Sequence, residues 1–342
     1  MIVLVTGGAG YFGTVLRQRL RARGASVRTF DLALPDDLAA GEEAVQGDIR
    51  DAAAIAAACR GVEIVHHNVA QVPLAKDRHL FESVNIQGTD NLLCGARAAG
   101  VRKVVYTSSS AVFGAPASNP VTEETPPAPA EAYGRAKYEG ERRCQAYAAE
   151  GLDVSIMRPR TILGHGRLGI FQILFEWVRS GANIPVLGRG DNRYQFVHAE
   201  DLASACILAG ERPGAAVYNC GTDRFGTMRD ALEALCRHAG TGSRVRSVPM
   251  GPAILAMKLT SAIGLSPLGP YHALMYGRSM YFDLAKITRE LGWAPRYSND
   301  DMFVESYDWY LANRERVLAS SGASLHRSAV RQGVLGLVRR LL

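Results

Sequence analysis

The chain begins with a short apolar strand, Ile-Val-Leu-Val-Thr, that leads directly into a glycine-rich turn. The glycines follow a T-G-x-x-G-x-x-G pattern, and helical periodicity starts within it. Gly7 permits a tight turn, Gly10 lets backbone amides approach a pyrophosphate at the helix N-terminus, and Gly13 lets the helix pack close to the strand. The segment therefore predicts a dinucleotide site, which also includes Tyr11 and Phe12.

Short apolar runs alternate with helical segments through the first half of the chain. Strands are predicted over 2–6, 26–31, 62–66, 103–108 and 154–158, with helices near 11–23, 51–59, 78–98 and 131–150 between them. Pairs of β-branched residues such as Ile64-Val65 suit strands that helices cover on both faces. The pattern predicts an α/β fold, a doubly wound parallel Rossmann sheet with a smaller, mostly C-terminal α/β substrate domain.

Glycines interrupt shorter elements after Pro159, which indicates a second domain. The runs 196–198 and 216–219 look like strands that return to the main sheet. We therefore divide the chain into three parts. Residues 1–160 and about 195–222 form a Rossmann domain, about 161–194 and 223–318 form the substrate domain, and 319–342 form a basic amphipathic tail.

The formal net charge of +6 is unevenly distributed along the chain. Four arginines and no acidic residue lie in the last 22 residues, so the preceding chain carries only +2. This distribution does not support a nucleic-acid-binding surface. The N-terminus has no signal-peptide pattern, and the six cysteines form no C-x-x-C pair and no zinc-ligand spacing. We therefore expect buried reduced thiols, no metal and a cytoplasmic protein.

Asp31 ends the second predicted strand, 18 residues after Gly13. A carboxylate at this point accepts hydrogen bonds from the adenosine ribose hydroxyls and repels a 2′-phosphate. Apolar residues follow it, and no lysine or arginine among them could pair with such a phosphate. The sequence therefore favours NAD over NADP, although Arg28 lies three residues earlier and leaves the alternative open.

A Y-x-x-x-K motif, Tyr133 to Lys137, falls on a predicted helix, so both side chains lie on one face. A lysine ammonium there can lower the phenol pKa from about 10 and make the tyrosine a general acid or base. Isolated pairs of this kind are common on helix surfaces. Here a strand ending in the hydroxyls of Ser108, Ser109 and Ser110 precedes the motif, and ligands bind at the carboxyl ends of such strands.

The chain resembles an extended short-chain dehydrogenase/reductase of the NAD-dependent epimerase/dehydratase family over nearly its whole length. The segments that carry the resemblance are 6–13, 47–49, 85–93, 108–114, 133–137, 158–159, 196–203, 218–221 and 291–295. The resemblance implies NAD as cofactor. It also implies a homodimer formed through the helices that contain residues 85–99 and 133–147.

The resemblance implies roles for individual residues. Tyr133 would transfer the proton, and Lys137 would hold the nicotinamide ribose. Asp48 and Ile49 would flank the adenine. Ser109 would hydrogen-bond the substrate hydroxyl or carbonyl, because it lies five residues before the glycine that closes its motif. The neighbouring serine hydroxyls are expected to bond local structure.

Sugar-nucleotide 4,6-dehydratases of this family carry an acidic pair just after the catalytic hydroxyl, where this chain has Ser110 and Ala111. The segment Ser-Ser-Ala-Val-Phe-Gly instead resembles nucleotide-sugar 4-epimerases. The resemblance therefore implies epimerase-type hydride transfer on a nucleotide sugar. Arginines suit a diphosphate because their fork donates two hydrogen bonds. The candidate substrate contacts are Arg193, Tyr194, Gln195 and Arg278.

Residues 252–265 are unusually apolar for a region that meets a nucleotide. A buried helix is the plainer interpretation of this run. The alternative is an apolar hydroxy or keto substrate, as in the related 3β-hydroxysteroid dehydrogenase-like branch, which has the same Ser, Tyr and Lys. A non-enzymatic NAD-binding protein is a third hypothesis, and the joint presence of Ser109, Tyr133 and Lys137 argues against it.

The tail, 325–342, follows the region of resemblance. Its apolar residues share one helical face and its arginines flank or oppose that face, a pattern typical of a helix on an anionic membrane surface. Docking on the protein's own body, docking on a dimer partner and terminal disorder are the alternatives. The apolar residues are Val330, Val334, Leu337, Val338 and Leu341.

Overall fold

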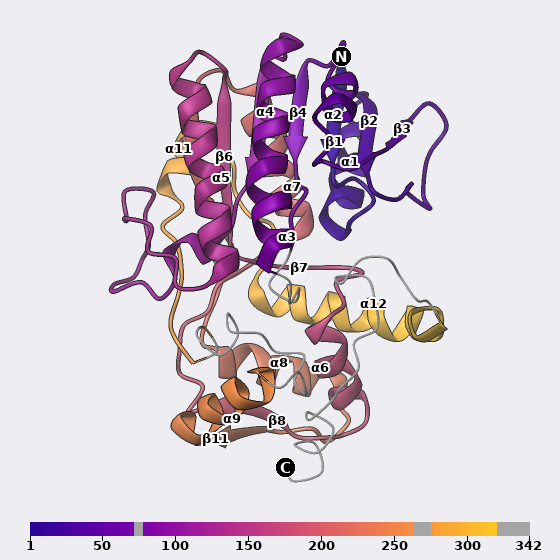
Figure 1. The fold of residues 1–342 in the computed structure, drawn as a ribbon. Coiled ribbons are helices and arrows are strands. Elements are labelled where there is room, and N and C mark those ends of the chain that lie inside the picture. The colour runs from indigo at the N-terminus through magenta and orange to yellow at the C-terminus, as the bar shows by residue number, and fades with distance from the viewer. Residues whose placement is uncertain (72–77, 263–274, 276, 320–342) are drawn as a thin grey trace.

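The computed structural model describes residues 1–71, 78–262, 275 and 277–319. A seven-stranded parallel sheet occupies one half of the molecule (Figure 1). Its strand order, β3-β2-β1-β4-β5-β6-β10, is that of two joined mononucleotide-binding halves with one added strand. The strands are β1 (Ile2–Thr6), β2 (Ser26–Asp31), β3 (Glu43–Gln46), β4 (Ile64–His67), β5 (Lys103–Thr107), β6 (Val154–Pro159) and β10 (Ala216–Cys220).

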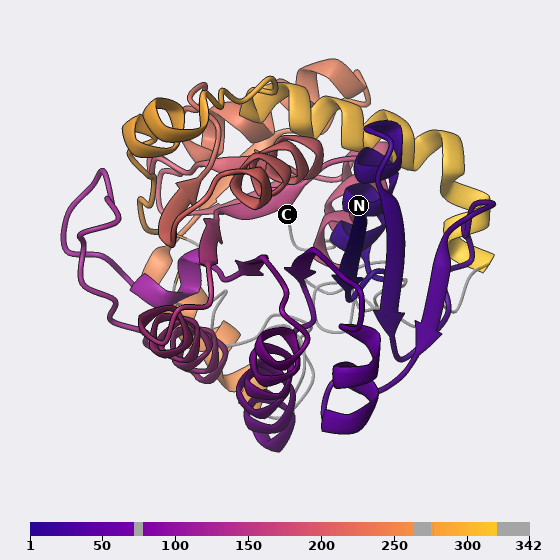
Figure 2. The same cartoon turned by 90° about the horizontal axis from the view of Figure 1, so that it is seen from above.

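Helices cover both faces of this sheet, and Figure 2 shows the strands between the two helix layers. Side chains alternate along β1: Val3 and Val5 join one apolar core, and Leu4 joins the other. The first core contains α1 (Tyr11–Ala22), α7 (Ala199–Glu211) and α11 (Ala285–Leu291). The second contains α2 (Ala52–Ala58), α4 (Gly88–Ala98) and α5 (Ala132–Ala149). The doubly wound fold class is therefore confirmed.

A smaller group of elements lies beyond the carboxyl ends of the strands, and α12 crosses between the two groups (Figure 1). The two strands of this smaller group, β8 and β11, pair in parallel. Aromatic side chains, among them Phe171, Phe175 and Phe303, form its core. The elements are α6 (Ile170–Arg179), β8 (Ile184–Leu187), α8 (Met228–Ala239), β11 (Val245–Val248), α9 (Met250–Ala262) and α12 (Asn299–Ala319).

The helix predicted over 78–98 consists of three pieces, α3 (Arg78–Glu82), a π-helical turn η1 (Ser83–Gln87) and α4. Asn85 lies within the π turn and is fully buried. Its side chain accepts from the backbone N–H of Gln71 at 2.7 Å and donates to the carbonyl of the same residue at 3.1 Å. The π turn thus occurs where Asn85 makes these two hydrogen bonds. Apolar periodicity in the sequence does not predict such a turn.

The chain does not return to the main sheet at residues 196–198. Those residues form a strand, β9 (Phe196–His198), but it pairs with β7 (Thr161–Leu163) in a separate two-stranded sheet. Only β10 joins the main sheet, beside β6. The strands β3, β7, β8 and β11 were not predicted, because each has only three or four residues and little alternation.

The apolar run 252–265 forms a helix up to Ala262, as α9, but it is not buried as expected. Leu255 and Leu259 are each 59% exposed. The buried-helix interpretation is therefore wrong for the described part of the run. Residues 263–265 and the predicted tail beyond Ala319 lie outside the described residues.

The cysteines are all free thiols, and Cys94 is exposed where a buried thiol was expected. Within the described ranges, no helix combines the length and apolar character needed to cross a bilayer.

A buried ion pair ties α5 to the sheet. Glu141 on α5 is fully buried, and its carboxylate accepts from the Arg158 Nε at 2.9 Å and the Nη2 at 2.6 Å. The Ser108 hydroxyl, just beyond β5, donates to the same carboxylate at 2.6 Å. One carboxylate therefore links α5, β6 and the end of β5.

We predict that Glu141→Ala lowers the free energy of unfolding by about 3–5 kcal/mol, because it leaves the Arg158 guanidinium buried without its counterion. Urea unfolding measures this change. Glu139→Ala is the matched control, since Glu139 lies on the same helix in an exposed pair with Arg142, and a loss of at most about 1 kcal/mol is expected. Equal losses in the two variants would contradict the prediction.

Candidate active site

A cavity of about 1530 Å³ opens over the carboxyl ends of β1, β2, β4 and β5 and extends toward α6, α8 and α9. Ligands of doubly wound sheets bind at this edge. The glycine turn, Asp31, Asp48, Ile49, Ser109, Tyr133 and Lys137 all line it. The structure therefore brings the predicted cofactor and catalytic residues together in one cavity.

The glycine turn is as tight as its pattern predicts. A Cβ added to Gly13 would lie 2.1 Å from the Gly7 carbonyl oxygen, so no other residue fits there. Gly7 has a φ of +71°, and its N–H donates to the Phe30 carbonyl at 2.9 Å. The first turn of α1 contains no acidic residue. Its free N–H groups and positive dipole end suit a pyrophosphate.

Asp31 and Arg28 point to different sides of β2. The Asp31 carboxylate accepts from the Ala9 N–H at 2.9 Å and the Leu32 N–H at 2.7 Å, and it lines the cavity. Arg28 pairs with Glu43 at 2.7 Å on strand β3 and does not line the cavity. Arg28 is therefore not placed to bind a 2′-phosphate beside Asp31.

Asp48 and Ile49 line the cavity. Arg50 donates to the Asp48 carboxylate, and this hydrogen bond lowers the pKa of Asp48. Ile49 is buried against Gly88, where an added Cβ would lie 2.6 Å from the isoleucine Cγ2. The pair provides one charged and one apolar surface, which suits an adenosine.

The three serines after β5 have different partners. The Ser108 hydroxyl donates to Glu141, and the Ser110 hydroxyl accepts from Arg160 at 2.8 Å. Ser109 is half-buried, and its hydroxyl interacts with the Tyr133 phenol. The arrangement supports Ser109 as the hydroxyl that meets the substrate.

Tyr133 is placed by the start of α5. Glu131 caps this helix, and its carboxylate accepts from the N–H groups of Tyr133 and Gly134 at 2.8 and 2.6 Å. Gly134 packs so tightly that an added Cβ would lie 2.4 Å from the Ala111 carbonyl oxygen. The helix therefore begins directly against the Ser109 segment, which brings the two hydroxyls together.

Burial sets the acidity of the Tyr133–Lys137 pair. Burial raises the pKa of Tyr133 to about 12, although the hydrogen bond from Ser109 and the charge of Arg167 oppose the rise. The prediction that Lys137 lowers this pKa below its usual range is wrong, because the desolvation of the phenol dominates. Burial also lowers the pKa of Lys137 to about 8. Its ammonium lies 4.5 Å from the centre of the Tyr106 ring.

Of the four predicted substrate contacts, only Tyr194 lines the cavity. Arg193 is exposed and lies over the rings of Phe225 and Tyr281, 4.9 and 4.6 Å from their centres. The Gln195 amide is buried between the Thr222 carbonyl and the Phe282 N–H. Arg278 is also exposed and does not line the cavity. Spacing along the chain does not show which way these side chains point.

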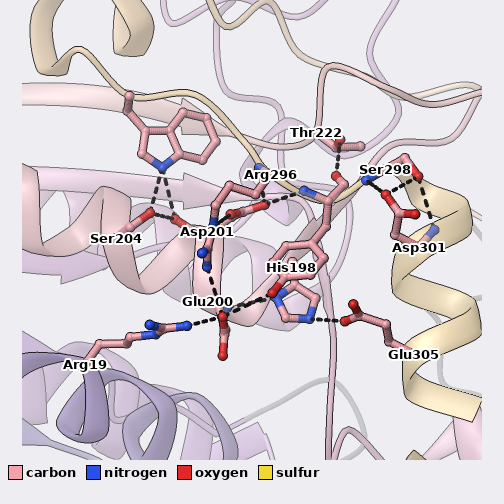
Figure 3. Close-up of polar contacts among 12 residues, drawn as sticks. Arg19, His198, Glu200, Asp201, Ser204, Thr222, Arg296, Ser298, Asp301 and Glu305 are labelled. Carbon is pink, nitrogen blue, oxygen red and sulfur yellow. Dashed lines mark hydrogen bonds and ion pairs between the residues drawn. The ribbon is translucent and has the colours of Figure 1, made fainter. Parts of the chain in front are cut away.

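A polar network at the cavity edge was not predicted (Figure 3). Glu200, at the start of α7, accepts from Arg19 on α1 and from Arg296. Asp201 accepts from the backbone N–H of Arg296 at 2.9 Å. His198 caps α7 through the Glu200 N–H. This network joins α1 to α7 and to the segment before α12. In the sequence, only the F-V-H-A-E-D segment at residues 196–201 pointed to these residues.

The chain belongs to the NAD-dependent epimerase/dehydratase family, whose model matches residues 3–221. An uncharacterized protein, y4nG of Sinorhizobium fredii, is 57% identical over 98% of this chain and 85% of its own length. The 3 beta-hydroxysteroid dehydrogenase/Delta 5-->4-isomerase of Mycobacterium tuberculosis is 32% identical over 92% of each chain. The UDP-glucose 4-epimerase of Thermotoga maritima has a similar fold, with a TM-score of 0.77 at 24% identity over 92% of this chain and 100% of that chain. The family is NAD-dependent, which indicates NAD as the cofactor of this chain.

We predict that this protein binds NAD at least about tenfold more tightly than NADP, because Asp31 would face the extra phosphate. Asp31→Ser should bring the ratio of the NADP and NAD dissociation constants, measured by calorimetry, closer to one. Asp223→Ser is the control, since it removes one exposed carboxylate outside the cavity. An unchanged ratio in Asp31→Ser would contradict the role of this carboxylate.

Proposed function

We propose that the protein is an NAD-dependent oxidoreductase that interconverts a secondary alcohol and a ketone on a substrate with a mainly apolar body. The observation that carries this proposal is the wall of the cavity beyond Ser109 and Tyr133. Apolar side chains from α6, α8, β8, β11 and α9 dominate that wall. They are Ile170, Phe171, Ile173, Leu174, Trp177, Leu187, Met228, Leu232, Val248, Ala253, Ala256 and Met257.

The placement of the arginines also supports an apolar substrate. Arg193 and Arg278, the residues expected to bind a diphosphate, are exposed and outside the cavity. Arg160 lines the cavity; its Nη1 donates to the Ser110 hydroxyl and contacts the Met280 sulfur at 3.2 Å, while its buried Nε and Nη2 have no hydrogen-bond partner among the described residues. The similarity to the 3 beta-hydroxysteroid dehydrogenase supports the same substrate class.

Nucleotide-sugar 4-epimerization is the second candidate function. Ser110 and Ala111 follow the Ser109 hydroxyl, so the segment has no acidic pair with which to eliminate water. The same Ser109 and Tyr133 would then remove and return the proton of a sugar hydroxyl. This candidate requires that the apolar half of the cavity hold a nucleotide.

The reaction divides between the cofactor and three side chains. Bound NAD would supply the redox chemistry, as acceptor of a hydride from the alcohol carbon or, in its reduced form, as donor of one to the ketone carbon. Ser109 holds the reacting oxygen, and Tyr133 exchanges a proton with it. Lys137 supplies positive charge beside the nicotinamide ribose. Because the pKa of Tyr133 is about 12, its phenol is protonated at neutral pH and is ready to donate to a carbonyl oxygen.

We predict turnover of apolar hydroxy or keto compounds, such as sterols and long-chain 3-oxo compounds, as followed by nicotinamide absorbance. We predict no epimerization of UDP- or dTDP-sugars, as followed by chromatography of the sugars, because epimerization leaves the nicotinamide unchanged overall. Tyr133→Phe should lower kcat by about 10²–10⁴ and leave NAD binding unchanged, because it removes only the proton donor. Tyr138→Phe, on the same helix but outside the cavity, is the control. Turnover of nucleotide sugars alone would favour the second candidate.

The raised pKa of Tyr133 also predicts opposite pH dependences for the two directions. Oxidation needs the phenolate, whose fraction grows about tenfold per pH unit below the pKa, so kcat/KM for oxidation should rise from about pH 6 to about pH 8. Reduction needs the phenol, so its kcat/KM should stay nearly constant over the same range. Parallel profiles for the two directions would show that another group transfers the proton.

A further inference from the structure

We propose that Arg167 binds the pyrophosphate of the cofactor. Arg167 lines the cavity together with Tyr11, the first residue of α1, and Tyr133. The proposal rests on the NAD dependence of the family and is independent of the substrate class proposed above.

The loop that carries Arg167 is shaped to bring it to Tyr11. Gly164 and Gly166 have φ values of +136° and +80°, and the Arg167 N–H closes the turn on the Gly164 carbonyl at 3.1 Å. A Cβ added to Gly164 would lie 3.0 Å from the Tyr11 hydroxyl. The loop between β7 and α6 therefore packs directly on the residue that begins the pyrophosphate-binding helix.

Arg167 has no counterion among the described residues. Its Nε donates to the Ile162 carbonyl at 3.3 Å, while its buried Nη1 has no hydrogen-bond partner. The rings of Tyr11 and Phe171, each with its centre 5.8 Å from the guanidinium carbon, are its other neighbours. A largely buried cation is costly unless an anion pairs with it. The site therefore suits an anionic ligand.

The position of Arg167 indicates which anion it meets. Its charge lowers the pKa of both Tyr11 and Tyr133, so it lies within electrostatic range of both phenols. Tyr11 marks the helix end that receives the pyrophosphate, and Tyr133 marks the nicotinamide side. The pyrophosphate joins these two halves of the cofactor. A guanidinium at this place can donate two hydrogen bonds to its oxygens.

Burial lowers the pKa of Arg167 to about 10, which leaves the side chain charged at neutral pH. The Tyr11 hydroxyl is a second buried polar atom without a partner at the same place. The two residues lie close together, since the loop that carries Arg167 packs on Tyr11. Both residues line the cavity that the glycine turn, Ser109 and Tyr133 also line.

Calorimetry on the full chain, without substrate, tests the proposal. Arg167→Met should raise the Kd of NAD and of ADP-ribose by the same factor, about ten- to a hundredfold, because a charged hydrogen-bond donor is lost. The Kd of adenosine, which has no phosphate, should stay unchanged. Arg167→Lys, which keeps the charge but not the fork, should show a smaller rise.

Arg189→Met is the matched control, since Arg189 is 88% exposed and pairs only with Asp191. It should leave all three dissociation constants within about twofold, which is less than about 0.5 kcal/mol. An unchanged Kd for NAD and ADP-ribose in Arg167→Met would overturn the proposal. A rise confined to the KM of a substrate would overturn it too, because the anion would then belong to the substrate. An equal rise in the Kd of adenosine would indicate a distorted cavity and would also contradict the proposal.

The test is separable from the substrate assignment. Binding of NAD and ADP-ribose requires no turnover, so failure to find an apolar substrate leaves the result intact. If Arg167→Met does not fold, the comparison of ADP-ribose with adenosine in Arg167→Lys gives the same decision. In that variant, equal ratios of the two constants before and after substitution would overturn the proposal.

Discussion

The arrangement of the active site depends on the buried ion pair between Glu141 and Arg158. Glu141 has no exposed side-chain surface and Arg158 has 4%, so water does not screen the attraction between them. The same carboxylate accepts from Ser108, the residue before Ser109. The pair therefore holds α5, with Tyr133 and Lys137, in register with the strand end that carries Ser109.

Burial also determines the electrostatics of the cavity. Burial keeps the Tyr133 phenol protonated and lowers the pKa of Lys137 to about 8, since both groups lose contact with water. Positive charge from Arg167 opposes the rise in the phenol pKa without cancelling it. An environment of this kind favours proton donation to a carbonyl.

The two halves of the cavity differ in chemistry. The half beneath the glycine turn presents N–H groups, carboxylates and arginines, whereas the half bounded by α6, α8 and α9 presents mainly apolar side chains. One face of α9 contributes Ala253, Ala256 and Met257 to that wall, while Leu255 and Leu259 on the same helix are exposed. The described part of the apolar run thus contributes three apolar side chains to the cavity wall and leaves its two leucines exposed.

The sequence by itself determined the local parts of this protein. The glycine turn, the end of β2 at Asp31 and the i, i+4 spacing of Tyr133 and Lys137 each depend on a few neighbouring residues, so pattern and stereochemistry predicted them. Only the tertiary structure decided which side chains face the cavity. Arg193 and Arg278 point away from it and Arg167 toward it, because packing between distant segments sets these directions. The pKa of Tyr133 was decided in the same way, since desolvation is the sum of neighbours that no local pattern identifies.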